Sequence, residues 1–242
     1  MRPALSRLRR DWTRLGDTDP LWAVCVDPAR KDGRWDLSEF NASGKTEIAF
    51  LIGELDRLGL GVRRERALDF GCGVGRLSGA LLSYYGSVTG VDISPPMVEL
   101  AGRLNPGCDY VLNDAPDLRL AGDASFDLVY SSLVLQHIPP ALARGYLAEF
   151  VRVARPGGVI ALLVPVSYGW SAPGLAYRLL PSALAGFVQR RCFGYPAPMR
   201  MRTLPARQVE RVVAPLGARL VASVPHPGYG GPWRMALQIL AR

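Results

Sequence analysis

Apolar positions form two kinds of pattern along this chain of 242 residues: helical repeats near its start and short uninterrupted runs further on. Between 46 and 59, every third or fourth position is apolar, which predicts an amphipathic helix. A second helical pattern lies near 3–15, and an aromatic-rich connector over 22–41 joins the two. Together these segments predict an N-terminal helical lead-in, or cap, over residues 1–60.

Strands and helices alternate through the next hundred residues. Short apolar runs predict buried strands at 66–70, 87–92, 108–113, 126–131 and 158–164. Helical patterns accompany them at about 76–85, 95–104 and 140–154. Short turns between alternating strands and helices require a parallel sheet with helices on both faces, here in a core of residues 61–164.

The rest of the chain departs from this alternation. Residues 165–204 form an insert after the fifth predicted strand, and Pro181 is expected to divide its apolar piece, 174–191, into two short helices. Ligands bind outside the carboxyl ends of strands in open α/β sheets. We therefore expect the insert to be a lid over the acceptor pocket, with a packing insert over the sheet edge as the alternative. A last helix and two strands complete the sheet within residues 205–242, at about 205–215, 218–224 and 234–240.

Three alternating glycines follow the first predicted strand, in the segment Asp-Phe-Gly-Cys-Gly-Val-Gly-Arg at 69–76. Glycines let a backbone turn tightly and approach a ligand closely, and the amides of the following helix N-terminus face that ligand. Seventeen residues past Gly75, the second strand ends on Asp92, whose carboxylate can accept both ribose hydroxyls. The sequence therefore predicts a nucleoside pocket.

Five segments, in this order, resemble the class I S-adenosylmethionine (SAM)-dependent methyltransferases, and in particular the branch that acts on small molecules. They are 68–76, 91–94, 113–115, 126–139 and 155–158. The resemblance implies an α/β, Rossmann-like fold with a seven-stranded, mostly parallel sheet whose last strand runs antiparallel. It also implies an enzyme that methylates an O, N or C atom of a small molecule and releases S-adenosylhomocysteine.

The resemblance also implies cofactor contacts for individual residues. It puts Asp69 near the methionine end of SAM, Asp92 and Ile93 at the ribose, Asp114 and Ala115 at the adenine, Ser131 under the sulfonium, and the backbone of Gly71, Cys72 and Gly73 along the cofactor. A turn cap competes for Asp114, and a helix-dipole charge competes for Asp69. Cys72 is expected to be a small filler rather than a catalytic thiol.

Aromatic side chains outside the core are candidates for the acceptor pocket. They are Trp35 and Phe40 in the connector, Tyr168 at the start of the insert, and Tyr229 and Trp233 in the loop before the last strand. Core packing explains the two connector aromatics equally well, and a fixed turn rich in proline and glycine would explain the loop.

The chain has only two histidines, and both are candidate catalytic bases. His137 follows the fourth predicted strand, and His226 lies in the loop before the last one. Imidazole titrates near neutrality, which suits a general base. Two alternatives stay open. His137 is a structural histidine that bonds a backbone carbonyl at the start of the next helix, or catalysis needs no base because the sulfonium already activates the methyl group.

The net excess of positive charge lies in the last third of the chain. Residues 165–242 hold ten arginines, no lysine and one glutamate, hence a net charge of +9, whereas residues 1–164 hold 19 basic and 20 acidic side chains. An arginine-biased surface would explain this excess, and so would a basic face for an anionic substrate, a carrier or a membrane. We expect a small-molecule acceptor, anionic or lipid-like, with peripheral membrane contact as an open alternative and no nucleic-acid partner.

Composition favours a cytoplasmic enzyme. No uninterrupted apolar stretch approaches the roughly 20 residues that span a bilayer. Five arginines and no apolar run occupy residues 1–15, which does not fit a secretory signal. The four cysteines are scattered without metal-ligand spacing, so we expect reduced thiols and no metal site.

Three other functions are compatible with parts of this pattern. A nicotinamide oxidoreductase needs a third glycine where Arg76 and Leu77 stand. A nucleic-acid methyltransferase would use the basic region, but 131–134 lacks the Asn/Asp-Pro-Pro-aromatic segment of such enzymes. A protein that binds SAM for a non-methylating reaction stays open.

Overall fold

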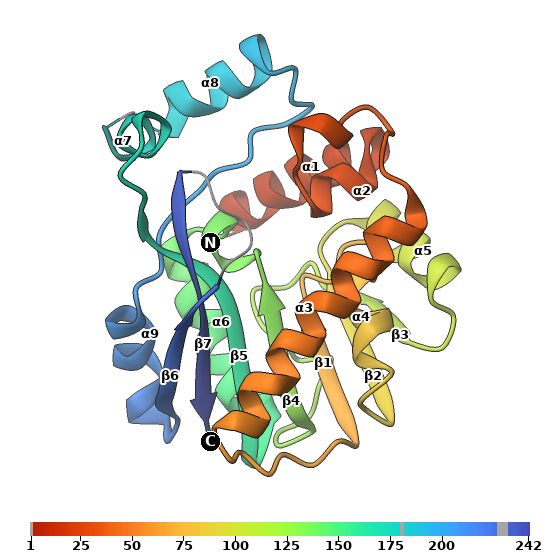
Figure 1. Ribbon diagram of the computed structural model, residues 1–242, viewed down its shortest axis with the longest axis vertical. Helices are drawn as coiled ribbons and strands as arrows, with labels where there is room; N and C mark the ends of the chain where they lie inside the picture. The colour runs from red at the N-terminus through yellow and green to blue at the C-terminus, as the bar shows by residue number, and fades with distance from the viewer. Residues whose placement is uncertain (1, 180–181, 227–231) are drawn as a thin grey trace.

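One seven-stranded sheet with helices on both faces organises the molecule. The computed structural model describes residues 2–179, 182–226 and 232–242. Figure 1 shows α3 (Leu37–Arg57) crossing the front of the sheet and α6 (Pro140–Val153) behind it. In the same view, α1 (Arg2–Thr18) and α2 (Pro20–Val24) lie above the carboxyl ends of the central strands.

The sheet has the order β3-β2-β1-β4-β5-β7-β6. Its strands are β1 (Arg66–Phe70), β2 (Ser87–Asp92), β3 (Asp109–Leu112), β4 (Phe126–Ser132), β5 (Ala154–Tyr168), β6 (Arg219–Pro225) and β7 (Trp233–Ala241). The first five strands pair in parallel, and β7 pairs antiparallel with both β5 and β6. The predicted seven-stranded, mostly parallel sheet with an antiparallel last strand is therefore confirmed.

The remaining helices follow the strands as connections or as additions at the carboxyl edge. They are α4 (Arg76–Leu81), α5 (Pro95–Leu104), α7 (Ala172–Leu179), α8 (Ser182–Cys192) and α9 (Ala206–Val213), with short 3-10 helices η1 (Pro28–Arg30), η2 (Leu135–His137) and η3 (Ala214–Leu216). The insert thus contains two helices, and Pro181, where we expected the break, lies outside the described residues. Within the described chain, no helix combines the length and apolar character that a membrane span demands.

Alternation of side chains along β1 gives the sheet two apolar faces. Leu68 and Phe70 belong to one core cluster, in which the Phe70 ring lies 4.9 Å from that of Phe150 on α6. Ala67 points to the other cluster, which packs against α3 and α4. A third cluster, around Trp22 and Phe40, joins the N-terminal helices to the carboxyl edge of the sheet.

The N-terminal region is more helical than its sequence pattern predicted. Helix α3 begins at Leu37 rather than near 46, because the Asp36 carboxylate accepts hydrogen bonds from the amides of Ser38 and Glu39 and caps the helix. Asp19 caps α2 in the same way, so the segment 22–41 is not a purely irregular connector. Both Asp caps were visible in the sequence, but the apolar period alone does not reveal them.

Strand β5 is also longer than predicted, running from Ala154 instead of 158. The segment 155–158, expected as a turn before the strand, is a bulge within it, with Gly157 at φ 77°. Pairing with β7 extends the other end to Tyr168, which lies opposite Trp233. The extended strand brings the insert directly over the carboxyl edge of the sheet.

Candidate active site

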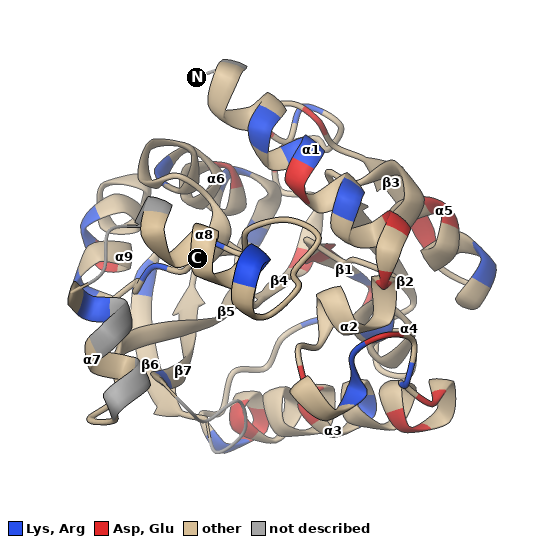
Figure 2. Ribbon diagram, turned by 90° about the horizontal axis from the view of Figure 1, so that it is seen from above, with Lys and Arg blue, Asp and Glu red and all other residues tan. Residues whose placement is uncertain are grey.

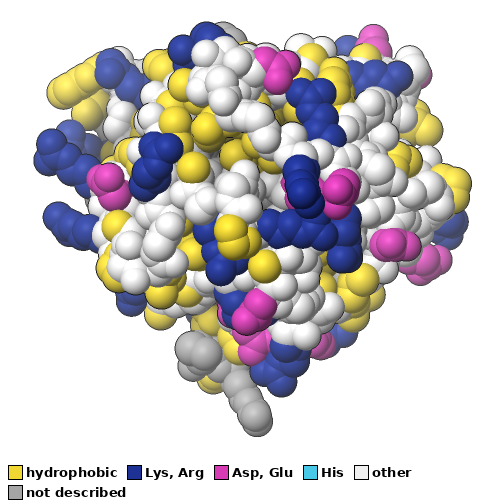
Figure 3. Space-filling view, turned by 90° about the horizontal axis from the view of Figure 1, so that it is seen from below, with side chains coloured by type: hydrophobic (Ala, Val, Ile, Leu, Met, Phe, Trp, Pro, Cys, Tyr) yellow, Lys and Arg dark blue, Asp and Glu magenta, His cyan; other side chains and the backbone are white. Residues whose placement is uncertain are grey.

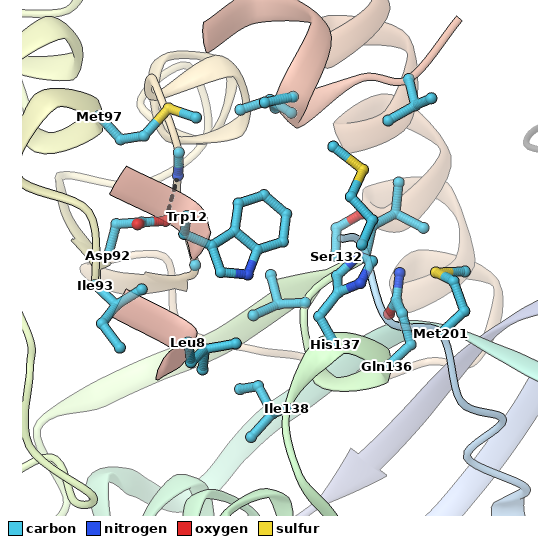
Figure 4. A pocket seen from close by; sticks show the side chains of 18 of the residues that line it. Leu8, Trp12, Asp92, Ile93, Met97, Ser132, Gln136, His137, Ile138 and Met201 are labelled. Atoms are coloured by element: carbon cyan, nitrogen blue, oxygen red, sulfur yellow. Dashed lines mark hydrogen bonds between the residues drawn. The ribbon is translucent and has the colours of Figure 1, made fainter. Parts of the chain in front are cut away.

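A cavity of about 360 Å³ lies at the carboxyl ends of the parallel strands. The sheet contributes the residues that follow β1, β2, β3 and β4, among them Gly71, Asp92, Asn113 and Gln136. Trp12 enters from α1, as the close view in Figure 4 shows. The insert adds Gln189, Tyr195, Met199 and Met201, so both terminal regions of the chain help to enclose the space.

The glycine loop after β1 is closely packed and accepts only glycine. Gly71, Gly73 and Gly75 have φ values of 77°, 53° and 82°, which side chains disfavour. A Cβ on Gly71 would collide with the Val134 side chain, and one on Gly73 with Val24. Gly71 and Gly73 line the cavity, so the backbone of this loop is open to a ligand.

Asp92 ends β2 and lines the same part of the cavity. One of its carboxylate oxygens accepts from the Gly73 amide at 3.0 Å, and the other accepts from the Ser94 amide at 2.9 Å. Desolvation raises the pKa of Asp92, and the amide hydrogen bonds oppose that shift. A carboxylate offers about four acceptor sites, so two remain for a ligand's hydroxyl groups. Ile93, beside it, also lines the cavity.

Asp69 lies beneath the glycine loop and not among the cavity-lining residues. Its carboxylate is 1% exposed and accepts from the Ser78 hydroxyl on α4 at 2.7 Å. Desolvation raises its pKa to about 7, although the Ser78 hydrogen bond and the Arg76 charge lower it. Asp69 therefore holds the loop from below, and its predicted contact with SAM stays a prediction.

The turn after β3 reaches the cavity through a different residue from the one predicted. Asn113 lines the cavity, and its amide nitrogen donates to the Asp117 carbonyl. Asp114 is exposed and pairs with Arg9 of α1 at 2.8 Å. Ala115 lies outside the lining too, and its carbonyl accepts from the Tyr146 hydroxyl.

Two smaller residues of the predicted cofactor set are buried beside the cavity. Burial raises the pKa of the Cys72 thiol well above its usual value, so the group stays protonated and is no nucleophile. Ser131 is 1% exposed and does not line the cavity, whereas Ser132 does. Both observations fit a small-residue packing layer around the glycine loop.

His137 lies in the cavity wall and is held on two sides. Its Nδ1 is 2.6 Å from the Arg200 carbonyl, and its ring packs edge-on against Trp12 at 5.1 Å. Burial lowers the pKa of His137 to about 4, with the nearby Arg202 charge acting in the same direction. The neutral ring therefore ties the insert to the turn after β4. The structural alternative predicted a backbone carbonyl at the start of the next helix, whereas the carbonyl contacted here belongs to the insert.

The other predicted acceptor residues are mostly outside the cavity. His226 packs edge-on against Phe50, 4.9 Å between rings. Trp35 and Phe40 pack against each other in the third core cluster, as the packing alternative stated. Tyr168 stacks on Trp233 with rings 5.1 Å apart, and of these residues only Trp233 lines the cavity. Tyr229 lies outside the described residues.

Two polar groups in the cavity wall have no internal hydrogen-bond partner. Gln136 is 2% exposed, and the described chain offers its Oε1 no donor; the same holds for the hydroxyl of Ser132, which is 9% exposed. Buried polar atoms are nearly always hydrogen-bonded, so these two point to a ligand. Neither was singled out from the sequence, although Gln136 stands in the quoted segment 126–139.

We expect His137→Asn to leave turnover within about tenfold of wild type, because a group with a pKa of about 4 is neutral and weakly basic at pH 7. The asparagine amide can still donate to the Arg200 carbonyl. Since the folded-state pKa is lowered, His137 contributes stability above pH 6.5 that is lost as the pH falls through about 4. Between pH 6.5 and about 4, the free energy of unfolding of the wild type should fall by up to about 3 kcal/mol, and that of the variant should fall less. Urea unfolding at pH 4 to 8 measures this.

His226→Asn is the matched control, since that ring lies outside the cavity lining. It should leave turnover unchanged. A drop in kcat of more than about a hundredfold for His137→Asn, with loss of the acidic limb of the pH profile, would instead make His137 a general base.

The central part of the chain, which carries β1 to β4 and part of β5, is similar to known methyltransferases. Residues 68–162 match the family model described as "Methyltransferase domain". The malonyl-[acyl-carrier protein] O-methyltransferase of Serratia marcescens is 39% identical over 99 residues, which is 40% of this chain and 36% of that protein. A ubiquinone biosynthesis O-methyltransferase of Xanthomonas campestris is 33% identical over 127 residues, 48% of this chain and 52% of that one. The chain thus spans about half or less of these relatives.

Solved structures with the same fold cover more of the chain. The magnesium protoporphyrin IX methyltransferase of Synechocystis with bound SAH superposes with a TM-score of 0.60 at 18% identity, over 88% of this chain and 90% of that one. A SAM-dependent methyltransferase from Leishmania major gives a TM-score of 0.65 at 14% identity, over 96% and 82%. At such identities the likeness concerns the fold alone.

Proposed function

We propose that this chain, whose residues 68–162 match the model of a methyltransferase domain, is a class I SAM-dependent methyltransferase that transfers the SAM methyl group to a small-molecule acceptor in the cavity. One observation carries the proposal. The glycine loop and Asp92 line one part of a cavity whose wall also holds the unpartnered Oε1 of Gln136. A cofactor site and an acceptor site in a single space are what a transferase needs.

The cofactor part of the cavity fits an adenosyl group. Gly71 and Gly73 leave no room for a Cβ, and Asp92 keeps two acceptor sites for ribose hydroxyls after its two amide bonds. Asn113 and Met97 line this space and are candidates for the adenine end. SAM supplies a methyl group that its sulfonium charge already activates.

The acceptor part is mainly apolar, with few polar groups. Trp12, Val134, Met199 and Met201 line it, so we infer an acceptor with a hydrophobic body. Gln136 can accept one hydrogen bond from the acceptor's polar group. An apolar, lipid-like acceptor fits this lining better than an anionic one.

The proposed chemistry relies on positioning more than on a protein base. Holding two reactants in line at about 3–3.5 Å contributes up to about 7–11 kcal/mol to a barrier reduction. Trp12 and His137 pack edge-on and keep the wall rigid, while the apolar side chains exclude water. Gln189, Tyr195 and Met199 of the insert line the cavity, which supports a lid role for residues 165–204.

Two measurements test the proposal. The first is isothermal titration with SAM, and the second is detection of S-adenosylhomocysteine by mass spectrometry after incubation with a panel of apolar phenols, quinols and amines. Micromolar SAM binding and acceptor-dependent product are expected. Binding of NADH in place of SAM would refute the proposed methyl transfer. If SAM binds and is chemically changed but no methylated product forms, the result would favour the non-methylating alternative.

We expect Gln136→Leu to separate stability from function. Leucine is apolar and removes the unpartnered Oε1, a group whose burial costs about 1–3 kcal/mol, so the free energy of unfolding should stay equal or rise. The Michaelis constant for the acceptor should rise about tenfold, the loss of one hydrogen bond, while SAM affinity stays unchanged. Gln208→Leu, on α9 away from the cavity lining, is the control and should leave the acceptor constant unchanged. A destabilised Gln136→Leu with an unchanged acceptor constant would contradict the assignment.

A further inference from the structure

The two helices of the insert and the residues that flank them expose large apolar side chains to solvent. Trp170 is 80% exposed, Leu179 78%, Phe193 60% and Phe187 54%. With Leu175 and Leu184, each 45% exposed, they form what we call the insert surface. Half of the twelve large apolar side chains exposed in the described chain thus gather within 24 residues, which marks an interaction site rather than scattered exposure.

The apolar side chains face outward because of the way each helix is packed. On α8, Leu184 and Phe187 are three positions apart and share the outer side of the helix. The opposite side is fixed by Gln189, which exchanges hydrogen bonds with the backbone of Met199 at 2.9 and 3.0 Å. On α7, Leu175 and Leu179 are four positions apart and both exposed. The outward apolar face is therefore built into the packing.

The charges on this surface are all of one sign. Arg178, Arg190 and Arg191 are exposed, and no ion pair joins them to any described residue. Residues 165–209 contain no Asp or Glu. Figure 2, seen from above, shows α8 with blue segments and no red ones.

The opposite face of the molecule has a different character. Figure 3, seen from below, shows basic side chains with acidic ones beside them. Beside the start of β1, Arg155 pairs with Glu65 at 3.0 Å and Arg64 pairs with Asp56 at 3.0 Å. Neutralised charges of this kind are typical of an ordinary solvated surface, whereas the insert surface keeps its positive charge.

We propose that the insert surface docks the protein onto an anionic lipid bilayer. Helices with an apolar face and flanking arginines lie in the interface between headgroups and acyl chains, tryptophan is enriched at that depth, and each arginine near anionic lipid adds to binding. Figure 1 shows α7 and α8 projecting beyond the rest of the molecule. A projecting tip reaches a flat bilayer first, which favours a membrane over a concave protein partner.

Docking would bring the cavity close to the membrane. The insert presents its apolar side chains outward, while Gln189, Tyr195 and Met199 line the cavity from within. A membrane-resident acceptor would therefore pass from the bilayer along the insert into the cavity. This last step rests on the proposed methyl transfer; the docking itself does not.

Co-sedimentation of the whole protein with lipid vesicles tests the proposal. The probes are vesicles of phosphatidylcholine alone and of phosphatidylcholine mixed equally with phosphatidylglycerol. We expect binding to the anionic vesicles, and Leu184→Ser/Phe187→Ser should weaken it at least about tenfold because the buried apolar area is lost. Leu112→Ser/Leu216→Ser removes two side chains of similar exposure elsewhere and should leave binding unchanged.

A second pair of variants, one test and one control, measures how much the arginines contribute to vesicle binding. Arg190→Gln/Arg191→Gln should weaken anionic-vesicle binding several-fold, and Arg207→Gln/Arg211→Gln, exposed on α9, should not. Raising the salt concentration should weaken binding by wild type as well.

Three outcomes would overturn the docking proposal. In the first, the wild type fails to bind anionic vesicles, and in the second, the Leu/Phe variant and its control lose equal vesicle affinity. The third outcome is a wild-type dimer that the Leu/Phe variant converts into a monomer, which would make a second copy the occupant of the surface. SAM titration without vesicles keeps the two proposals apart. Vesicle binding by a protein that fails to bind SAM would refute the methyl transfer and leave the docking intact.

Discussion

Asp92→Ala is expected to weaken SAM binding by about 1–3 kcal/mol, the scale of a charged hydrogen-bond partner lost from a partly buried site. The carboxylate bonds the Gly73 and Ser94 amides and keeps two acceptor sites for ribose hydroxyls. Its removal therefore takes away ligand contacts and loosens the glycine loop at the same time. Isothermal titration of SAM against both proteins measures the loss directly.

Asp109→Ala provides the control for this measurement. Asp109 is an exposed carboxylate at the start of the neighbouring strand β3, and its removal should leave SAM affinity unchanged. Asp92→Asn separates the two effects, because one oxygen remains to accept from a loop amide while the negative charge is gone. Unchanged SAM affinity in Asp92→Ala would overturn the ribose-site assignment.

Arg76→Met is expected to lower the free energy of unfolding by about 3–5 kcal/mol, because it leaves a buried carboxylate unpaired. Arg76 donates to Glu47 at 2.8 Å across the α3–α4 contact, and the two side chains are 2% and 3% exposed. Tyr130 on β4 donates to the other Glu47 oxygen at 2.8 Å. Loss of the guanidinium should also raise the pKa of Asp69 further, since Arg76 lowers it in the native protein.

A double variant distinguishes the ion pair from simple packing. In Glu47→Gln/Arg76→Met the neutral amide can still accept from Tyr130, so most of the lost stability should return. Arg103→Met breaks the exposed pair with Glu99 and should cost less than about 0.5 kcal/mol. If Arg76→Met cost no more than Arg103→Met, or if the double variant were as unstable as the single one, the pair would have no special role. Chemical unfolding at pH 7 gives all four values.

Local signals in the sequence predicted most of the sheet. Strands 66–70 and 87–92 were predicted to the residue, because their apolar runs end at glycine turns or at a polar strand end. The glycine loop was equally readable, since its positive φ values favour glycine. The start of α3 was missed because its first turns lie before the apolar period, and the Asp36 cap marks it instead.

Contacts between distant parts of the chain could not be read in this way. Asp114 pairs with Arg9, 105 residues away, and nothing in either local sequence indicates it. Trp12 and Met199 reach the cavity from opposite ends of the chain, and only the packing of α1 and the insert over the sheet brings them together. His226 looked like a base by chemistry alone, yet the hairpin sets it against Phe50.

The cavity wall is formed by residues inside and outside the matched range 68–162, and this division has a consequence for the choice of acceptor. Eleven of its 26 lining residues lie outside residues 68–162 and belong to the terminal helices, the insert or the final hairpin. The glycine loop and Asp92, which we propose to bind SAM, are inside that range, so the outer segments can be exchanged without altering these residues. A chimera that carries the N-terminal helices and insert of another enzyme on this sheet should keep its affinity for SAM and acquire the donor enzyme's choice of acceptor. Acceptor preference and SAM affinity would then depend on separate parts of the chain.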